Sequence, residues 1–252
     1  MGLRVCLPVR SRGRPRVIGP WLAPARRGWH RDGMSDWLPP MPTRPNTPVV
    51  LWVVGLTCLP ELLFLLAESP FFGLSGPRNW AVLHFAFWNQ LLVGAEPLWT
   101  FQREAMFLSY AFLHGGLLHL AGNMVVTLAL AGVVVARSSE RGFLVAYALS
   151  AIGGGVGYAL LGPVGSPMVG ASGAVFGLIG AWKYWEWQDR RRYGAGMKPL
   201  WMSLIGLALL NVALWWLLGG LLAWQAHLGG FVAGWLWAAA VSTPRPGRAP
   251  PS

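Results

Sequence analysis

The chain has 252 residues, of which 54% are hydrophobic and only 12% are charged, and it contains 16 tryptophans and 33 glycines. These values exclude an ordinary soluble domain. They are typical of a polytopic membrane protein, which is rich in glycine and places tryptophan at the membrane interfaces. The net charge of +11 does not indicate nucleic acid as a partner, because the basic residues form blocks between apolar segments. We therefore expect a lipid bilayer around the chain and no bound nucleic acid.

The N-terminal segment 1–47 holds nine of the twenty Lys and Arg residues, many prolines and no acid before Asp32. This composition predicts a basic, disordered cytoplasmic tail. An organellar transit peptide and a translation start at Met34 or Met41 are alternatives that the sequence leaves open. We expect three parts: this tail, a membrane domain over 48–241 and a short cytoplasmic tail over 242–252.

Six apolar segments follow the tail, and most of them approach the roughly 20 residues that cross a hydrocarbon core of about 30 Å. They cover 49–67, 117–136, 142–161, 170–187, 200–218 and 223–241. The sequence therefore predicts an all-α polytopic membrane protein with six spanning helices. Pro60 and Glu61 interrupt the first segment. We interpret Glu61 as an acid that faces the interface or another helix, and a buried functional acid is the alternative.

Segment 80–94 is apolar, but its length of about 15 residues is short for a span. We interpret it as an interfacial helix within a long first outer loop, 70–105. The charges support this, since 18 of the 20 Lys and Arg residues lie in alternate connections, which the positive-inside rule places in the cytoplasm. Both termini are then cytoplasmic, and a crossing by 80–94 would make the number of spans odd.

Polar side chains gather in the predicted outer half of the membrane. His114 lies at the mouth of the second span, and His119 and Asn123 follow on one helix face, four residues apart. Ser172 begins the fourth span, and His227 lies about one turn into the sixth. Because such groups are rare within spans and mark functional sites, we expect these five side chains to form one site.

Small residues allow the helices that carry Ser172 and His227 to approach closely. Gly173 belongs to a stripe of small residues on the serine helix, and Gly230 and Gly234 form a stripe on the last helix. Packing of the two stripes would bring the imidazole within hydrogen-bonding reach of the hydroxyl. His227 could then take the hydroxyl proton as a general base.

The remaining parts of a hydrolytic site have candidates as well. Backbone N–H groups at the start of the serine helix, the His119 imidazole and the Asn123 amide are possible donors to a tetrahedral oxyanion. Phe176, one turn below the serine, either packs against the base or takes part in ordinary packing. A single Asn or His in a membrane helix more often joins helices by hydrogen bonds. Several such groups at one depth favour a site.

Other catalytic patterns are absent from the sequence. A Gly-x-Ser-x-Gly elbow would need glycine at Ala174. The two histidines of the second span are five residues apart with no acid between them, unlike a zinc-binding helix, and no P-loop or dinucleotide fingerprint occurs. Cys6 and Cys58 indicate neither a disulfide framework nor a metal knuckle. We expect no metal and no cofactor, and a Ser-His dyad, because no acid lies near His227 in the sequence.

Three motifs resemble those of the rhomboid family of intramembrane serine proteases. They are H-G-G-L-L-H-L-A-G-N over 114–123, G-A-S-G over 170–173 and A-H-L-G-G over 226–230, continuing to Gly234. The resemblance covers roughly residues 48–241 and implies a six-transmembrane-helix rhomboid-like bundle. It implies the following roles: Ser172 as nucleophile; His227 as general base; His119, Asn123 and the Ser172 backbone at the oxyanion; Phe176 beside the base; Gly170 and Gly173 flanking the serine; Gly230 and Gly234 in the helix contact; and His114 as a structural or water-retaining residue.

One feature departs from the family pattern. Rhomboids commonly carry an adjacent Trp-Arg pair in the first outer loop, whereas here Trp99 and Arg103 are separated. The loop is therefore of a divergent type, and no role is transferred to either residue.

The leading hypothesis is an intramembrane serine endopeptidase that cleaves transmembrane protein substrates near the outer face of a bilayer. A bacterial plasma membrane is the expected location, and an organellar membrane is the alternative. A catalytically inactive rhomboid-like protein that binds transmembrane helices is the second hypothesis. It is disfavoured because both Ser172 and His227 are present. A solute transporter is disfavoured because the polar residues lie in only one leaflet.

Overall fold

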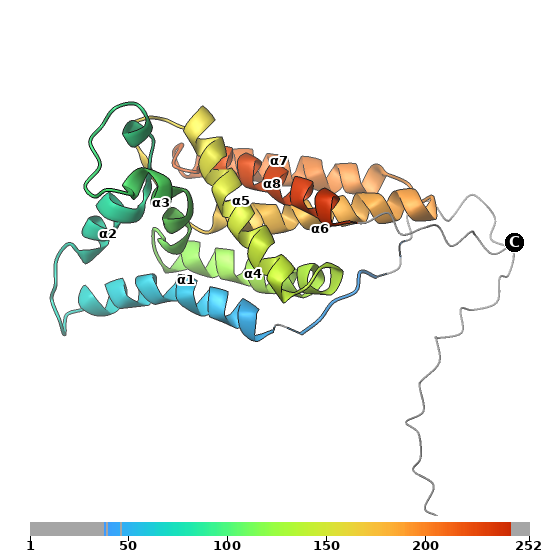
Figure 1. Cartoon of the computed structure of the whole chain (residues 1–252), viewed down its shortest axis with the longest axis horizontal. Helices are drawn as coiled ribbons and strands as arrows, with labels where there is room; N and C mark the ends of the chain where they lie inside the picture. The colour runs from blue at the N-terminus through green and yellow to red at the C-terminus, as the bar shows by residue number, and fades with distance from the viewer. Residues whose placement is uncertain (1–37, 39, 46, 243–252) are drawn as a thin grey trace, which may run out of the picture. The chain divides into compact units, whose positions relative to one another are not determined.

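The structure is a computed structural model that describes residues 38, 40–45 and 47–242. Within these residues the elements follow in the order α1 (Pro48–Ala67), α2 (Pro77–Phe85), β1 (Phe87–Trp88), η1 (Asn89–Leu92), α3 (Gln102–Ser109), η2 (Tyr110–Phe112), α4 (Leu117–Arg137), α5 (Glu140–Leu161), β2 (Pro167–Met168), α6 (Ser172–Tyr193), α7 (Lys198–Leu217) and α8 (Trp224–Val241). Each of the six predicted apolar segments is a long helix, and α6 continues past its predicted end at 187 (Figure 1).

The predictions for the two tails fall mainly on residues 1–37 and 243–252, which lie outside the described residues. The described end of the N-terminal segment lies against α4, where the Arg44 N–H donates to the carbonyl of Gly132 at 3.1 Å. The segment around Arg44, which was predicted to belong to a disordered tail, is therefore hydrogen-bonded to α4.

Helices α5, α6 and α8 make the closest contacts in the bundle, and glycine is the reason. A Cβ added at Gly230 would lie 1.9 Å from the carbonyl oxygen of Gly173, and one added at Gly234 would lie 1.9 Å from that of Gly177. On the α5 side, a Cβ at Gly157 would lie 2.4 Å from the Gln225 carbonyl oxygen. The backbones of α6 and α8 are thus in direct contact, as in membrane helices with small-residue interfaces.

We expect Gly230→Ala and Gly234→Ala to lower the free energy of unfolding by about 1–3 kcal/mol each, because the new methyl group forces two backbones apart. Thermal unfolding in detergent, followed by tryptophan fluorescence, measures this. The matched control is Gly206→Ala in α7, where an added Cβ meets nothing within 4 Å and alanine only improves helix propensity. Equal stability of all three variants would contradict the backbone contact.

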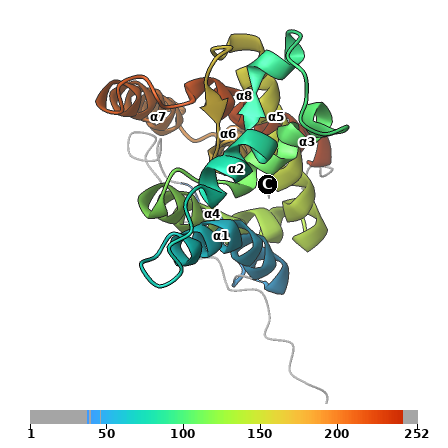
Figure 2. The same cartoon turned by 90° about the vertical axis from the view of Figure 1, so that its left-hand side faces the viewer.

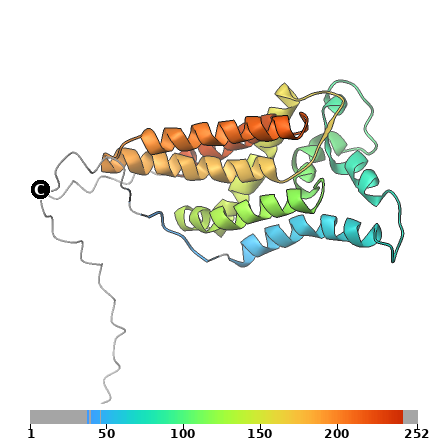
Figure 3. The same cartoon turned by 180° about the vertical axis from the view of Figure 1, so that it is seen from behind.

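Helices α1 and α7 lie at the outside of the bundle, away from the close contact of α5, α6 and α8. Helices α1 and α7 are at two edges, with α4 and α6 between them, both in the view along the bundle (Figure 2) and from the side (Figure 3). Only 17% of the most apolar window of α1 and 6% of that of α7 is buried, and both helices present apolar side chains outward. These outer surfaces are suited to contact with lipid.

Four of the described helices, α1, α4, α5 and α7, are long and apolar enough to cross a membrane by their length and composition. Helix α6 is less apolar because its second half carries charges that pair with one another. Glu186 accepts from Lys183 at 2.8 Å and from Arg190 at 2.9 Å, and Asp189 pairs with Arg137 of α4. The architecture is therefore a predominantly helical polytopic membrane fold in which α6 carries paired charges.

The interfacial helix predicted over 80–94 is wrong in its extent. Helix α2 ends at Phe85, and the chain then forms β1, which pairs antiparallel with β2 so that Phe87 faces Met168. The Asn89 amide donates to the carbonyls of Tyr158 and Gly162 at the end of α5, at 2.9 and 3.0 Å. Hydrogen bonds to distant parts of the chain thus replace the helical ones. At this end of the bundle, here called the loop end, α2, α3 and segment 162–171 lie together (Figure 1).

Candidate active site

Ser172 is the first residue of α6 and lies at the loop end. The residues before it are held by the backbone: the Gly170 N–H donates to the Tyr110 carbonyl at 3.0 Å, and the Ala171 N–H donates to Nε2 of His114 at 3.3 Å. Within the described residues the Ser172 hydroxyl has no hydrogen-bond partner, so it does not cap its own helix.

His114 fixes the peptide immediately before the serine. Its side chain is 2% exposed, and burial, followed by the nearby His119, lowers the pKa of His114 to about 3. The ring is therefore neutral at physiological pH, as it must be for Nε2 to accept the Ala171 N–H. The structural or water-retaining role of His114 stays a prediction. The next N–H groups, at the start of α6, have no acceptor within their own helix.

His119 lies directly against Gly170. A Cβ added at Gly170 would lie 2.7 Å from Nε2 of His119, and Gly170 has a φ of +123°, so glycine is required there for two reasons. The Gly115 N–H donates to Nδ1 of His119 at 3.4 Å, which leaves the proton of the neutral ring on Nε2. A ring N–H donor is thus placed beside the serine segment.

Asn123 is buried one turn deeper on α4, but its amide stays within its own helix. Nδ2 donates to the His119 carbonyl at 3.1 Å, and the Thr127 hydroxyl donates to the Asn123 carbonyl at 2.8 Å. No hydrogen bond joins the Asn123 amide to Ser172 in the described part of the chain. The amide would have to exchange its helical acceptor for a substrate oxygen to act as an oxyanion donor.

His227 is buried in α8 and is stacked on Phe176 of α6. The ring centroids are 4.0 Å apart and the planes differ by 7°. Phe176 thus packs against the imidazole of His227, which is one of the two alternatives that the sequence left open. Among the described side chains, no hydrogen bond joins Ser172 to His227. Catalytic contacts of this kind are often long before substrate binds, so the missing bond does not by itself exclude a role for the two groups.

Two residues that contact this site were not predicted. The Tyr110 hydroxyl donates to the Ala151 carbonyl at 2.8 Å and lies over Gly173, so Tyr110 contacts the serine segment through both its side chain and its carbonyl. Asn211 of α7 places Oδ1 at 2.5 Å from Nδ1 of His227. The rule that selected the histidines, a polar residue inside an apolar helix, also applies to Asn211; nothing in the sequence distinguishes Tyr110.

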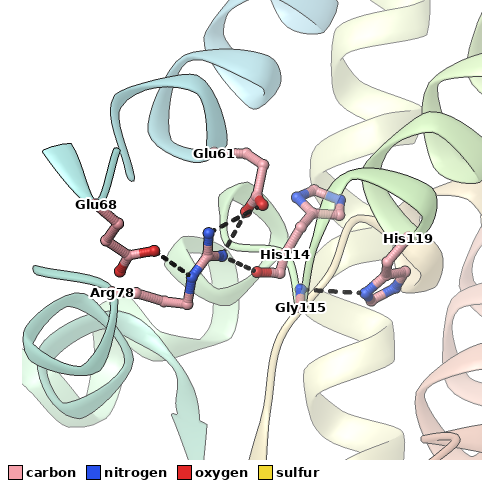
Figure 4. A network of polar contacts seen from close by, with 6 residues as sticks. All are labelled: Glu61, Glu68, Arg78, His114, Gly115 and His119. Carbon is pink, nitrogen blue, oxygen red and sulfur yellow. Dashed lines mark hydrogen bonds and ion pairs between the residues drawn. The ribbon is translucent and has the colours of Figure 1, made fainter. Parts of the chain in front are cut away.

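Arg78 joins α1, α2 and the segment before α4 at the loop end (Figure 4). Its guanidinium donates to both carboxylate oxygens of Glu61, at 2.7 and 3.1 Å, to the His114 carbonyl at 3.1 Å, and approaches Glu68 at 3.5 Å. Glu61 is fully buried, and its carboxylate serves this ion pair. Glu61 is therefore an acid that faces another helix, which is the preferred one of the two interpretations.

We expect Arg78→Met to lower the free energy of unfolding by about 3 kcal/mol, because it leaves the buried Glu61 carboxylate unpaired. The double variant Glu61→Gln with Arg78→Met should recover part of this loss. Glu68→Gln is the control and should change little, since Glu68 is a third exposed and only approaches the guanidinium. Thermal unfolding of the three variants measures these differences. If Arg78→Met is as stable as the double variant, the unpaired Glu61 carboxylate does not destabilise the fold.

The described residues contain no group of three His, Cys, Asp or Glu side chains placed to hold a metal ion. What they contain is a serine at a helix end, two histidines against the residues that precede it and apolar helices around them. The fold is that of a polytopic membrane protein, and a serine at a helix end with histidines on neighbouring helices is its candidate site.

The family can be stated from sequence comparison. A family model described as "Rhomboid domain" matches residues 96–244, more than half of the chain. The chain belongs to the rhomboid family and is an integral, multi-pass membrane protein.

Two curated relatives are similar over about half of the chain. "Rhomboid protease GluP" of Bacillus subtilis (strain 168) is 32% identical over 138 residues, which are 54% of this chain and 25% of that protein. "RHOMBOID-like protein 5" of Arabidopsis thaliana is 35% identical over 131 residues, which are 50% of this chain and 40% of that protein. The matches thus cover between a quarter and two fifths of the relatives' own length.

Proposed function

We propose that the chain is an intramembrane serine endopeptidase in which Ser172 is the nucleophile and His227 the general base. The observation that carries the proposal is the arrangement around the serine. Its preceding peptides are bound to His114 and Tyr110, and the imidazole of His227 is fixed by stacking on the same helix that begins with Ser172. Membership of a family that includes a relative named as a protease supports it.

The reaction follows from these groups. The Ser172 oxygen attacks the carbonyl carbon of the scissile peptide while its proton passes to His227, and the carbonyl electron pair forms an oxyanion. His227 then gives the proton to the leaving amine as the C–N bond breaks, and an ester of Ser172 remains. Water attacks the ester carbonyl carbon while His227 takes a proton from the water; His227 then returns this proton to the Ser172 oxygen as the ester C–O bond breaks, which releases a carboxylic acid product and restores the serine hydroxyl.

The oxyanion needs donors that already point at it. The N–H groups of the first turn of α6 and the Nε2–H of His119 are placed for this, since His119 lies against Gly170. Asn123 is a further donor if its amide leaves the His119 carbonyl. These assignments, together with the helix contacts of Gly173, Gly230 and Gly234, are part of the proposal.

The same proposal fixes a topology. Helices α6 and α8 cross the membrane along with α1, α4, α5 and α7, because the polar side chains within these two helices are largely buried: Lys183, Glu186 and Arg190 in α6 and His227 in α8. The membrane domain is then 48–241, both termini are cytoplasmic, and the loop end faces outward. Substrates are transmembrane proteins cut near that face, and a bacterial plasma membrane is the proposed location.

The direct test uses the purified full-length protein with a model transmembrane substrate in liposomes, together with a serine-directed fluorophosphonate probe. We expect cleavage of the substrate and attachment of the probe to Ser172, located by peptide mass spectrometry. A folded protein that neither cleaves nor labels would reject the proposal.

An inactive protein that binds transmembrane helices is the second candidate, and one observation favours it: the Ser172 hydroxyl and His227 share no hydrogen bond among the described side chains. Binding of the transmembrane substrate without cleavage, and without labelling of Ser172, is the result that this candidate predicts.

A further inference from the structure

The side-chain amide of Asn211 is held in one orientation by its own helix. Its Nδ2 donates to the Leu207 carbonyl at 2.9 Å, and its Oδ1 lies 2.5 Å from Nδ1 of His227. The reverse orientation would place Oδ1 against the Leu207 carbonyl, where two acceptors would repel each other. The amide oxygen therefore faces the imidazole.

This orientation decides which nitrogen of His227 carries the proton. An amide oxygen can only accept a hydrogen bond, so Nδ1 must be the donor. In the neutral ring the other nitrogen, Nε2, is then unprotonated, and this is the form that can take a proton from a serine hydroxyl. Asn211 thus selects the tautomer that a general base needs.

The surroundings strengthen this bond. His227 is 6% exposed, and the Asn211 and His227 side chains line a cavity of about 590 Å³ whose other walls are mainly apolar residues of α7 and α8. A hydrogen bond in such surroundings is stronger than one in water. Among the described residues it is also the one side-chain hydrogen bond that joins α7 to another helix.

We infer that Asn211 is a positioning residue for the reaction, which holds His227 in the Nδ1-protonated tautomer and orients its ring between α6 and α7. The inference rests on the proposed function. When Nε2 takes the serine proton, the ring carries protons on both nitrogens and a positive charge. The Nδ1–H remains bound to Asn211, whose neutral amide neither gains nor loses a proton.

Three variants of the full-length protein test the inference. Asn211→Leu keeps the shape of the side chain and removes the acceptor; its kcat should fall by about 10- to 100-fold, the effect of losing a hydrogen bond to a group that becomes charged. Its KM should not change. Asn211→Asp keeps an acceptor oxygen at the same position and should retain most of the activity. Val212→Ala changes the wall of the same cavity without touching this bond and should cleave as the wild type does.

A spectroscopic measurement separates positioning from mere packing. The chain has five histidines, and the ¹⁵N signals of His227 can be assigned by their disappearance in His227→Gln. In the wild type and in Asn211→Asp we expect a protonated Nδ1, with an unprotonated Nε2 in the wild type. In Asn211→Leu we expect the proton to move largely to Nε2.

The outcomes differ clearly. A wild-type tautomer in Asn211→Leu, or a wild-type kcat in that variant, overturns the inference, as does an Asn211→Asp variant that is as impaired as Asn211→Leu. Failure of the proposed function has another signature: no cleavage and no probe attachment even in the wild type, with the Nδ1-protonated signal of His227 intact. That result would leave Asn211 a structural partner of His227 and reject its part in catalysis.

Discussion

Replacing Ser172 by alanine is expected to reduce cleavage of a reconstituted transmembrane substrate by at least about 10⁴-fold, because no other group can form the acyl intermediate. The fold should be unaffected, since the hydroxyl has no hydrogen-bond partner among the described residues and its removal breaks no contact of the helix end. Measurement of initial rates in liposomes, with thermal unfolding of the same preparations, separates the two effects.

The matched control for this variant is Ser203→Ala. The Ser203 hydroxyl donates to the Leu200 carbonyl within α7, so this variant removes a hydroxyl from a membrane helix away from the candidate site. It should cleave at the wild-type rate. If Ser172→Ala also retains the wild-type rate, the proteolytic mechanism proposed for this chain is wrong.

Replacing His227 by glutamine is expected to abolish both cleavage and fluorophosphonate labelling. A serine hydroxyl attacks a carbonyl or a phosphonate only when a base removes its proton, and glutamine cannot serve as that base. The loss in rate should approach that of Ser172→Ala, and the double variant should be no worse than either single one, because the two residues act as a unit. Initial rates and the fraction of labelled protein are the measurements.

His84→Gln is the control for a lost imidazole. His84 lies in α2 and is stacked on Trp80 with ring centroids 4.2 Å apart, much as His227 is stacked on Phe176, but it belongs to the loop end outside the candidate site. It should keep its activity and its labelling. Normal labelling of Ser172 in His227→Gln would show that another group activates the serine.

Much of the fold could be predicted from local properties of the chain. The six long helices follow from the lengths of the apolar segments, and their limits agree within a few residues except at the end of α6, where paired charges continue the helix to Tyr193. The structure of segment 80–94 could not be predicted from such local properties. Its apolar residues suit a helix, but Asn89 donates a hydrogen bond to the end of α5. No residue near Asn89 in the sequence indicates that α5 is its partner.

In the candidate site too, some residues could be predicted from the sequence and others could not. Ser172, His114, His119 and His227 could be selected because polar residues in apolar segments are few, and the glycine stripes indicated which helices meet. Their partners could not be selected by the same reasoning. The acceptor of the Ala171 N–H, the ring that lies on Gly170 and the amide that binds His227 come from helices far apart in the sequence.

The sequence by itself therefore determined the class of fold, the membrane setting and the residue types of the site, because apolar length, charge distribution and rare polar residues are local signals. Only the tertiary structure decided that Glu61 serves Arg78, that Phe176 supports the imidazole and that Asn211 faces His227. The physical reason is that hydrogen bonds and ring stacking act over about 3–5 Å and depend on orientation, so they are fixed only when separate helices have packed.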